Sequence, residues 1–383
     1  MKVVIAPQEF KGSISALEAA RAMEKGVKRV VPDIETVLVP VADGGDGTLQ
    51  TLVETSGGNL HRVSVTGPLG SEVEALWGAM GDGRTAVIEM ARTSGLALLH
   101  PDKLDCLTAT TYGLGEAIKA SLELGFRSLI IGIGGSATND GGAGMAQALG
   151  VRLLDSKGHD LPFGGAALAN LDHISMDTLD RRTLESEFLV ACDVSNPLTG
   201  PEGASAVYGP QKGATPKMVK RLDAALVHFA KIVQRDIGID IGNIPGGGAA
   251  GGLGAGMVAF LSATMRPGVD IVLETVGLEK KLVGADLVIT GEGQMDFQTI
   301  YKKAPIGVAK MAKKRDIPVI AISGSLGERF QVVHDHGIDA AAAITTAPMT
   351  LEEASAHASE LIASETEEAL RFLKTGAKVF GKR

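Results

Sequence analysis

The sequence contains few cysteines and few aromatic residues, and each scarcity excludes a class of protein. Its 383 residues include two cysteines, Cys106 and Cys192, whose spacing matches no metal-binding pattern. A disulfide framework is therefore excluded, and a reducing cytoplasm is the expected compartment. Aromatic residues make up 4% of the chain, which is too little for the stacking platforms that bind single-stranded nucleic acid.

Positive charge and long hydrophobic runs are also scarce. The formal net charge of −8 disfavours binding to nucleic acid and to anionic membrane surfaces. The apolar run at 3–6 is too short for a signal peptide. The uncharged stretch 241–265 is long enough to span a bilayer, but its glycines and Pro245 indicate a loop that leads into a buried helix. We therefore expect a cytoplasmic protein.

Two further absences concern catalysis. None of the eight histidines falls in the glycine-rich loops that follow the apolar runs. This disfavours histidine-based acyl transfer and zinc chemistry. The pattern G-x-x-x-x-G-K-[ST] does not occur, which excludes a P-loop fold.

Glycine, in contrast, is abundant: the 50 glycines are roughly twice the usual share of about 7%. They gather at the ends of short apolar runs, which are typical of parallel strands buried on both faces. The predicted strands cover 2–6, 36–41, 86–90, 128–133, 188–192, 287–290, 319–323 and 340–345. Because helical patterns fill the gaps between them, the sequence predicts an α/β fold with mainly parallel sheets.

Four helices are well marked. The first follows a capping box formed by Ser15 and Glu18 and ends before Pro32. A second is predicted over 112–124, and a third follows Pro216. The last, near 351–373, has a charged outer face and is expected to be a solvated surface helix.

Composition shifts along the chain predict two domains. Segments 1–62 and 283–383 read as regular β-α units, which together predict a discontinuous, doubly wound α/β domain. The stretch 63–282 is richer in turns and glycine loops, and we expect it to form an inserted α/β domain. Ligands of such sheets bind beyond the carboxyl ends of the strands, so we expect the active cleft between the two domains.

The most informative loop, 133–142, lies between a predicted strand and a predicted helix. Its glycines let backbone N–H groups approach an anion, and the helix N-terminus adds partial positive charge. Asp140 is expected to face a metal ion or a substrate hydroxyl group. The residues expected to contact phosphate or substrate are Gly134, Gly135, Ser136, Thr138, Asn139 and Asp140.

Three other loops carry carboxylates, of the kind that hold Mg²⁺ or act as a general base. Three lysines lie in similar loops and could neutralise phosphate. Taken alone, each pattern fits an ordinary turn, helix cap or surface lysine about as well. These candidate residues are Asp43 and Asp46, Asp193 and Asn196, Glu292 and Asp296, and the lysines Lys11, Lys212 and Lys303.

A rival interpretation comes from residues 246–251, which match G-x-G-x-x-G. This pattern binds dinucleotides when it follows a strand and opens a helix within a βαβ unit. No strand clearly precedes it here, so a nicotinamide-dependent oxidoreductase is the weaker hypothesis. Together, the loops favour phosphoryl transfer, which requires positioning and charge neutralisation more than histidine or thiol chemistry.

The loops also carry a family resemblance. In order, the chain contains Ala-Pro-x-x-Phe-Lys-Gly-Ser (6–13), Val-Ala-Asp-Gly-Gly-Asp-Gly-Thr (41–48), Gly-Ile-Gly-Gly-Ser-Ala-Thr-Asn-Asp-Gly-Gly-Ala-Gly-Met (132–145), Ala-Cys-Asp-Val-Ser-Asn-Pro-Leu (191–198), Tyr-Gly-Pro-Gln-Lys-Gly-Ala-Thr (208–215), Gly-Ala-Ala-Gly-Gly-Leu-Gly-Ala (248–255) and Val-Ile-Thr-Gly-Glu-Gly (288–293). This set resembles the type I glycerate kinases of bacteria over residues 1–345.

The resemblance implies ATP-dependent phosphorylation of D-glycerate with Mg²⁺, 2-phosphoglycerate as product, and two α/β domains with the site between them. Asp193, Lys11 and Glu292 are then the predicted catalytic residues, with Asp193 as general base. Asp46 and Asp296 are the predicted metal ligands. The predicted substrate and phosphate contacts are Asp43, Gly134, Gly135, Ser136, Thr138, Asn139, Asp140, Asn196, Lys212 and Lys303.

The chain departs from the family pattern in two loops. Gln8 and Glu9 stand where Asp-Ser is common, Gln294 stands in place of Arg, and Lys302 in place of Gly. These changes leave three readings open: a glycerate kinase, a kinase of another small hydroxy acid, and a weakened or non-catalytic protein that binds glycerate or nucleotide. The phosphorylated hydroxyl and the oligomeric state also stay open, with a homodimer among the alternatives.

Overall fold

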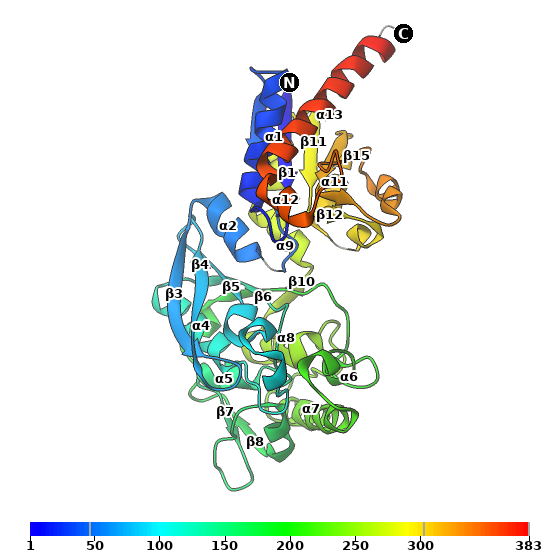
Figure 1. Cartoon of the computed structure of the whole chain (residues 1–383). Helices are drawn as coiled ribbons and strands as arrows, with labels where there is room; N and C mark the ends of the chain where they lie inside the picture. The colour runs from blue at the N-terminus through cyan, green and yellow to red at the C-terminus, as the bar shows by residue number, and fades with distance from the viewer. Residues whose placement is uncertain (46, 302, 382–383) are drawn as a thin grey trace. The chain divides into compact units, whose positions relative to one another are not determined.

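The computed structural model describes residues 1–45, 47–301 and 303–381 (Figure 1). Contacts within the chain divide it into two compact units. Unit 1 comprises residues 1–43, 50–55 and 269–383, and unit 2 comprises 44–49 and 56–268. The protein is an α/β protein with two main sheets, one in each unit.

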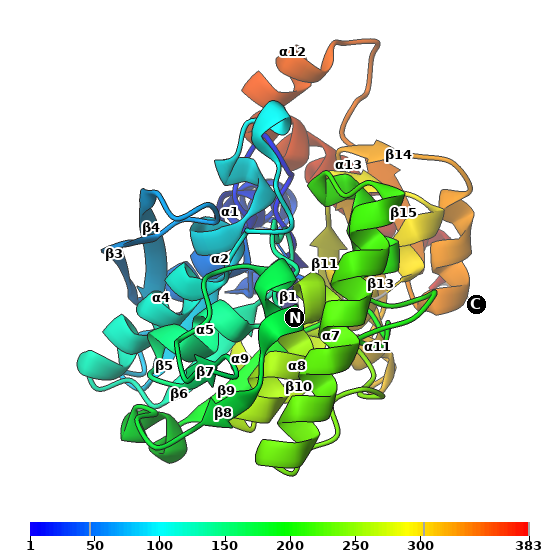
Figure 2. The same ribbon diagram turned by 90° about the horizontal axis from the view of Figure 1, so that it is seen from below.

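Unit 1 contains a five-stranded sheet in the order β15-β13-β11-β1-β2, in which every pair is parallel. Figures 1 and 2 show the blue N-terminal strand β1 among strands from the yellow and orange end of the chain. The strands are β1 (Lys2–Pro7), β2 (Glu35–Leu38), β11 (Leu287–Gly291), β13 (Val319–Ser323) and β15 (Ala340–Ala343). The middle strands are buried along their length, as the continuous apolar runs predict.

Helices α1 and α13 pack together and cover one face of this sheet. The capping box predicted at Ser15 is present, with Glu18 bonded back to the cap. Gly26 lies at the helix crossing, where a Cβ atom would come 2.3 Å from the Ala363 carbonyl oxygen. The helices of unit 1 are α1 (Ala16–Val30), α9 (Gly268–Thr275), α10 (Leu278–Lys281), α11 (Ala304–Lys313), α12 (Leu351–Ala356) and α13 (Ala358–Phe380), while α2 (Thr48–Ser56) has residues in both units.

Unit 2 contains a six-stranded mixed sheet in the order β10-β9-β6-β5-β4-β3. The four strands from β10 to β5 are parallel, whereas β5, β4 and β3 pair antiparallel. The strands are β3 (Asn59–Thr66), β4 (Glu72–Ala79), β5 (Thr85–Glu89), β6 (Ser128–Gly132), β9 (Glu187–Ala191) and β10 (Thr264–Arg266). Two small ribbons complete the strands: β7 (Arg152–Leu154) with β8 (His173–Ser175) in unit 2, and β12 (Gln294–Met295) with β14 (Ser325–Leu326) in unit 1.

The helices of unit 2 enclose its core. They are α3 (Ala91–Ser94), α4 (Tyr112–Glu123), α5 (Ala143–Ala148), α6 (Ala204–Tyr208), α7 (Pro216–Asp236) and α8 (Ala249–Leu261). Helix α8 is buried along nearly its whole length, as predicted for the uncharged stretch. In the described part of the chain, no helix has both the length and the apolar character that a membrane crossing requires.

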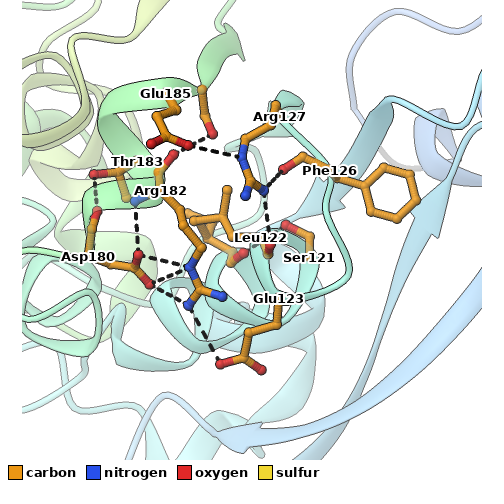
Figure 3. A network of polar contacts seen from close by, with 11 residues as sticks. Ser121, Leu122, Glu123, Phe126, Arg127, Asp180, Arg182, Thr183 and Glu185 are labelled. Carbon is orange, nitrogen blue, oxygen red and sulfur yellow. Dashed lines mark hydrogen bonds and ion pairs between the residues drawn. The ribbon is translucent and has the colours of Figure 1, made fainter.

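A polar network ties unit 2 together near the amino ends of β6 and β9 (Figure 3). Arg182 bonds Asp180 at 2.6 Å and lies 3.7 Å from Glu123 at the end of α4. Arg127 donates to two carbonyl groups of the α4–β6 turn and lies 3.9 Å from Glu185. This network lies at the end of the strands away from the glycine loops, so its role is structural.

Most predicted strands are confirmed to within a few residues, but three elements differ from the prediction. The antiparallel hairpin of β3 and β4 was not predicted, because one face of each strand is exposed and the runs are not continuously apolar. The predicted helix 351–373 is two helices, with a break at His357. Its second part is not simply solvated, since Ile362, Ala363 and Leu370 are buried.

Candidate functional site

A pocket of about 220 Å³ opens in unit 2 beyond the carboxyl ends of β6 and β9. Three glycine-rich loops supply most of its wall, from residues 44–45, 133–136 and 249–250. The other lining residues are Ala191, Cys192, Asp193, Val194, Tyr208, Gln211 and Lys212. Its place at the carboxyl edge of parallel strands is where α/β sheets bind ligands.

The loop after β6 presents backbone to this pocket. Gly134 has open space where a side chain would be, and Gly135 has a φ of 72°, a conformation that side chains disfavour. The far side of the loop is fixed, because the Gly135 carbonyl accepts from Leu96 and the Ala137 amide donates to Ser94, both at 2.9 Å. The loop is therefore a held backbone surface of the kind that binds phosphate.

Lys212 holds this loop from within the protein. Its side chain is 1% exposed, and its ammonium group donates to Ser136 Oγ at 2.7 Å and to the Thr138 carbonyl oxygen at 2.6 Å. Burial lowers the pKa of Lys212 to about 7, against the opposing effect of the nearby Asp140 charge. An ammonium group has three donors, so two of them fix the loop and one remains.

Asp140 takes a different place from the predicted one. It is fully buried, and it accepts from the Thr111 amide and hydroxyl at 2.8 Å and from the Gly142 and Gly144 amides at 3.2 Å. Burial raises its pKa, and these hydrogen bonds oppose the rise. The side chain caps the start of α5 and does not line the pocket, so its geometry is that of a structural carboxylate.

Thr138 and Asn139 are also turned into the protein. Both are fully buried, and the Asn139 amide donates to Ser205 Oγ at 3.0 Å. Thr138 contributes its carbonyl group to Lys212, as described above. Neither side chain is part of the pocket lining.

Asp193 and Asn196 follow β9 but differ in placement. Asp193 lines the pocket, is exposed, and accepts from the Gly268 amide at 3.1 Å. Asn196 accepts from the Tyr208 hydroxyl at 2.7 Å and donates to the Glu202 carbonyl at 2.8 Å. Asn196 therefore positions Tyr208, which lines the pocket, whereas Asp193 lines it directly.

The third wall of the pocket uses an uncommon backbone. Ala250, Gly251 and Gly252 are all left-handed, with φ of 52°, 70° and 91°. A Cβ atom on Gly251 would lie 2.0 Å from the Thr138 carbonyl oxygen, so only glycine allows this close approach. The glycine pattern here serves packing against the phosphate loop. It follows α7 rather than a strand, which removes the context that a dinucleotide site requires.

Unit 1 brings together a second group of predicted residues. Glu292 follows β11 and is 5% exposed, and it accepts from the Thr299 hydroxyl at 2.7 Å and lies 3.4 Å from Lys303 Nζ. Burial raises the pKa of Glu292, Lys303 opposes the rise, and the charge of Asp43 adds to it. Three predicted residues, Glu292, Lys303 and Asp43, thus share one electrostatic environment.

Lys11 lines another pocket in unit 1, of about 280 Å³, together with Ser13, Gly293 and Ser325. Asp296, in contrast, caps the short 3₁₀ helix Phe297–Ile300 by accepting from the Gln298 amide at 2.7 Å. Among the described residues, no group of three or more Asp, Glu, His or Cys side chains could hold a metal ion. Asp46 and Lys302 lie outside the described residues.

Comparisons with known proteins agree with this geometry. The sequence model of the Glycerate kinase family matches residues 3–374. The chain is 51% identical to the glycerate kinase of Bacillus subtilis (strain 168), over 99% of this chain and all of the other. It is 50% identical to the glycerate 2-kinase of Escherichia coli (strain K12), over 92% and 93% of the two chains.

The chain belongs to the glycerate kinase family. A crystal structure of a protein assigned as glycerate kinase 2 from Salmonella typhimurium LT2 has the same fold, with a TM-score of 0.92, 49% identity and 99% of each chain covered.

Several residues around this family member's pocket were not predicted from its sequence. Tyr208 and Gln211 line the pocket, and both precede Lys212 within a quoted motif that drew attention only to the lysine. Glu89 is also missing from the prediction: it is 7% exposed, accepts from the Leu49 amide at 3.0 Å, and bonds Arg92 at 2.7 Å. A carboxylate at the end of an apolar strand was the available signal for Glu89.

Proposed function

We propose that this protein phosphorylates D-glycerate with ATP and releases 2-phosphoglycerate. Family membership supports the reaction class. The observation that carries the proposal is the loop 134–138, whose backbone faces a pocket while Lys212 holds it from behind. Phosphoryl transfer depends mostly on positioning and on stabilising charge, and this arrangement offers both.

The unit 2 pocket suits a phosphate group of the nucleotide. Backbone N–H groups of Gly134 and Gly135 would donate to phosphate oxygens without a side chain in the way. The remaining donor of Lys212 would add a charge-assisted bond. Because water is excluded from Lys212, the attraction of its positive charge for phosphate is stronger than that of a surface lysine.

Asp193 is the proposed general base. It is the one carboxylate that lines this pocket among the described residues, and no histidine lines it. Its role would be to accept the proton of the glycerate hydroxyl as that oxygen attacks the γ-phosphorus. The Gly268 amide holds one carboxylate oxygen in place.

The residues present fit a nucleotide-bound Mg²⁺ ion rather than a cage made of protein. Such an ion needs one or two carboxylates and takes its other ligands from water and phosphate, and Asp193 offers one carboxylate in the pocket. When bound, Mg²⁺ would neutralise phosphate charge. The predicted metal ligands Asp46 and Asp296 remain candidates, although one oxygen of Asp296 already caps a helix.

The unit 1 residues are proposed to serve the acceptor. Lys303 and Lys11 are cations suited to the glycerate carboxylate, and Glu292, which shares the environment of Asp43, suits a substrate hydroxyl group. Both glycerate hydroxyls would then be distinguished by groups with opposite charge. This assignment explains why lysines and acids alternate in these loops.

The test is to identify the product. Purified protein is incubated with ATP, Mg²⁺ and D-glycerate, and the product is examined by ³¹P and ¹³C NMR. We expect phosphate on the 2-oxygen. Phosphate on the 3-oxygen would contradict the proposed product but keep the activity. Binding of ATP and glycerate by calorimetry without any phosphorylated product would instead favour the non-catalytic alternative, and D-lactate as substrate would test for a wider hydroxy-acid kinase.

A further inference from the structure

The second half of α13 carries a stripe of exposed apolar side chains. Phe372, Leu373, Val379 and Phe380 are 74%, 44%, 59% and 72% exposed. Their spacing of seven and eight residues places them on one face of the helix. A helix segment of about ten residues that lacks tertiary packing is marginal in water. Its physical chemistry therefore calls for a cover.

The same stripe continues into a groove on unit 1. The groove has a volume of about 420 Å³ and lies between α13 and the strands β13 and β15. From α13 it is lined by Glu365, Ala369, Phe372 and Leu373, and from the strands by isoleucine and alanine side chains. Strand β15 is the edge of the sheet. The groove and the stripe thus form one continuous apolar surface, which we name the α13 face.

Charge along α13 is divided between its halves. Residues 360–368 contain four glutamates and no basic residue, whereas 371–378 contain Arg371, Lys374 and Lys378 and no acid. Burial at the groove raises the pKa of Glu365, and the nearby Glu368 charge adds to the rise. An antiparallel copy of the same helix would lay its basic half against this acidic half, and the helix dipoles would also oppose.

Side-chain size fits the same arrangement. Gly376 lies on the stripe, and a Cβ atom there would meet only Phe380 Cδ2, at 3.9 Å. An antiparallel pair centred near Lys374 places Phe372 opposite Gly376 and Ala369 opposite Val379. In both pairs a large side chain faces a small one, as interlocking helices require.

We propose that the α13 face binds a second copy of this chain, with the two α13 helices antiparallel about a two-fold axis. Such an isologous interface uses one surface twice, so each helix end covers the groove of the other. The aromatic Phe372 is the central anchor of the interface. The proposal concerns assembly and does not depend on the proposed reaction.

The experiment measures mass by analytical ultracentrifugation across protein concentrations, for wild type and two variants. We expect wild type to be a dimer at about 10 µM. Phe372→Glu removes the anchor, and Gly376→Leu fills the space that receives it. Each should raise the dimer dissociation constant about 30-fold or more. Leu184→Glu, at a residue of unit 2 that is 76% exposed, is the matched control and should leave the dimer intact.

Two outcomes overturn the proposal. One is a wild-type monomer at about 100 µM, a concentration at which a specific dimer would form. If that monomer also sediments with vesicles of anionic phospholipid, the α13 face is a membrane surface instead. The other is a dimer that neither variant weakens, while thermal unfolding shows that both variants are folded. Because kinase activity is not the readout, a failed dimer says nothing against the proposed reaction.

Discussion

At the scale of single residues, the site separates groups that touch the pocket from groups that support it. Asp193 is exposed to the pocket, whereas Lys212 and Asp140 are buried behind the loops. All three are charged residues in glycine-rich loops, so the sequence cannot tell them apart. Their roles follow from the direction in which each side chain points, which only the fold determines.

The first prediction concerns Asp193. We expect Asp193→Asn to lower kcat by roughly 10²-fold or more, because the amide cannot accept the hydroxyl proton. KM for ATP should change little. Asp102→Asn is the control, since Asp102 is 88% exposed and belongs to another surface of unit 2. A kcat close to the wild-type value for Asp193→Asn would show that another group is the base.

The second prediction uses the buried ammonium group of Lys212. Burial lowers its pKa from the ordinary value of 10.5 to about 7. Between pH ~7 and ~10 the unfolded chain keeps a proton that the folded protein has lost, so folding stability rises with pH in this window. Below pH ~7 both states are protonated, and this contribution is constant.

Lys212→Met removes that titration. The free energy of unfolding of wild type, minus that of Lys212→Met, should rise by about 1.4 kcal/mol for each pH unit across the window. Denaturant unfolding at several pH values measures this difference, and the subtraction cancels the other titrating groups. A difference that does not vary between pH 7 and 9 would mean that the pKa of Lys212 is not lowered.

At the scale of elements, the sequence predicted what depends on local patterns. Buried strands such as β13 appear as unbroken apolar runs, and the Ser15 capping box marks the start of α1. The hairpin of β3 and β4 was missed because its residues alternate between exposed and buried. The break at His357 was missed because the apolar pattern continues past it, and the Thr350 cap begins only the first of the two helices.

The candidate site could be predicted loop by loop but not as an arrangement. The sequence pointed to the loops at 134–138 and 212, yet nothing in the 74 residues between Thr138 and Lys212 shows that they bond at 2.6 Å. The inward turn of Asp140 likewise depends on α4, whose first residues supply its donors. Contacts between distant segments are set by packing, which local patterns do not encode.

A third prediction belongs to the crossing of α1 and α13. In Gly26→Ala the new methyl group would lie 2.3 Å from the Ala363 carbonyl oxygen and 2.8 Å from Thr366 Cβ. The helices must separate, and we expect a loss of about 1–3 kcal/mol in unfolding free energy despite alanine's better helix propensity. Chemical denaturation measures the loss. Arg21→Ala, at an exposed position of the same helix, should change stability by less than about 0.5 kcal/mol, and a stabilised Gly26→Ala would refute the close crossing.

At the scale of the whole molecule, glycine content, charge and fold have one explanation. Parallel strands end in loops where backbone must come close to a ligand or to another loop, and glycine allows both. The net negative charge is no obstacle to an anionic substrate, because lysines such as Lys212 and Lys303 lie within the loops themselves. The polar network of Figure 3 lies at the other end of the unit 2 strands, where conserving the fold is the only requirement.

The most direct test of the central claim is steady-state ADP release by the purified full-length protein. With ATP and Mg²⁺ present, we predict that release depends on D-glycerate, saturates with it, and falls to background when glycerate is omitted. The Asp193→Asn protein should show the same background without the glycerate-dependent rate. ADP release that is equal with and without D-glycerate would contradict the account.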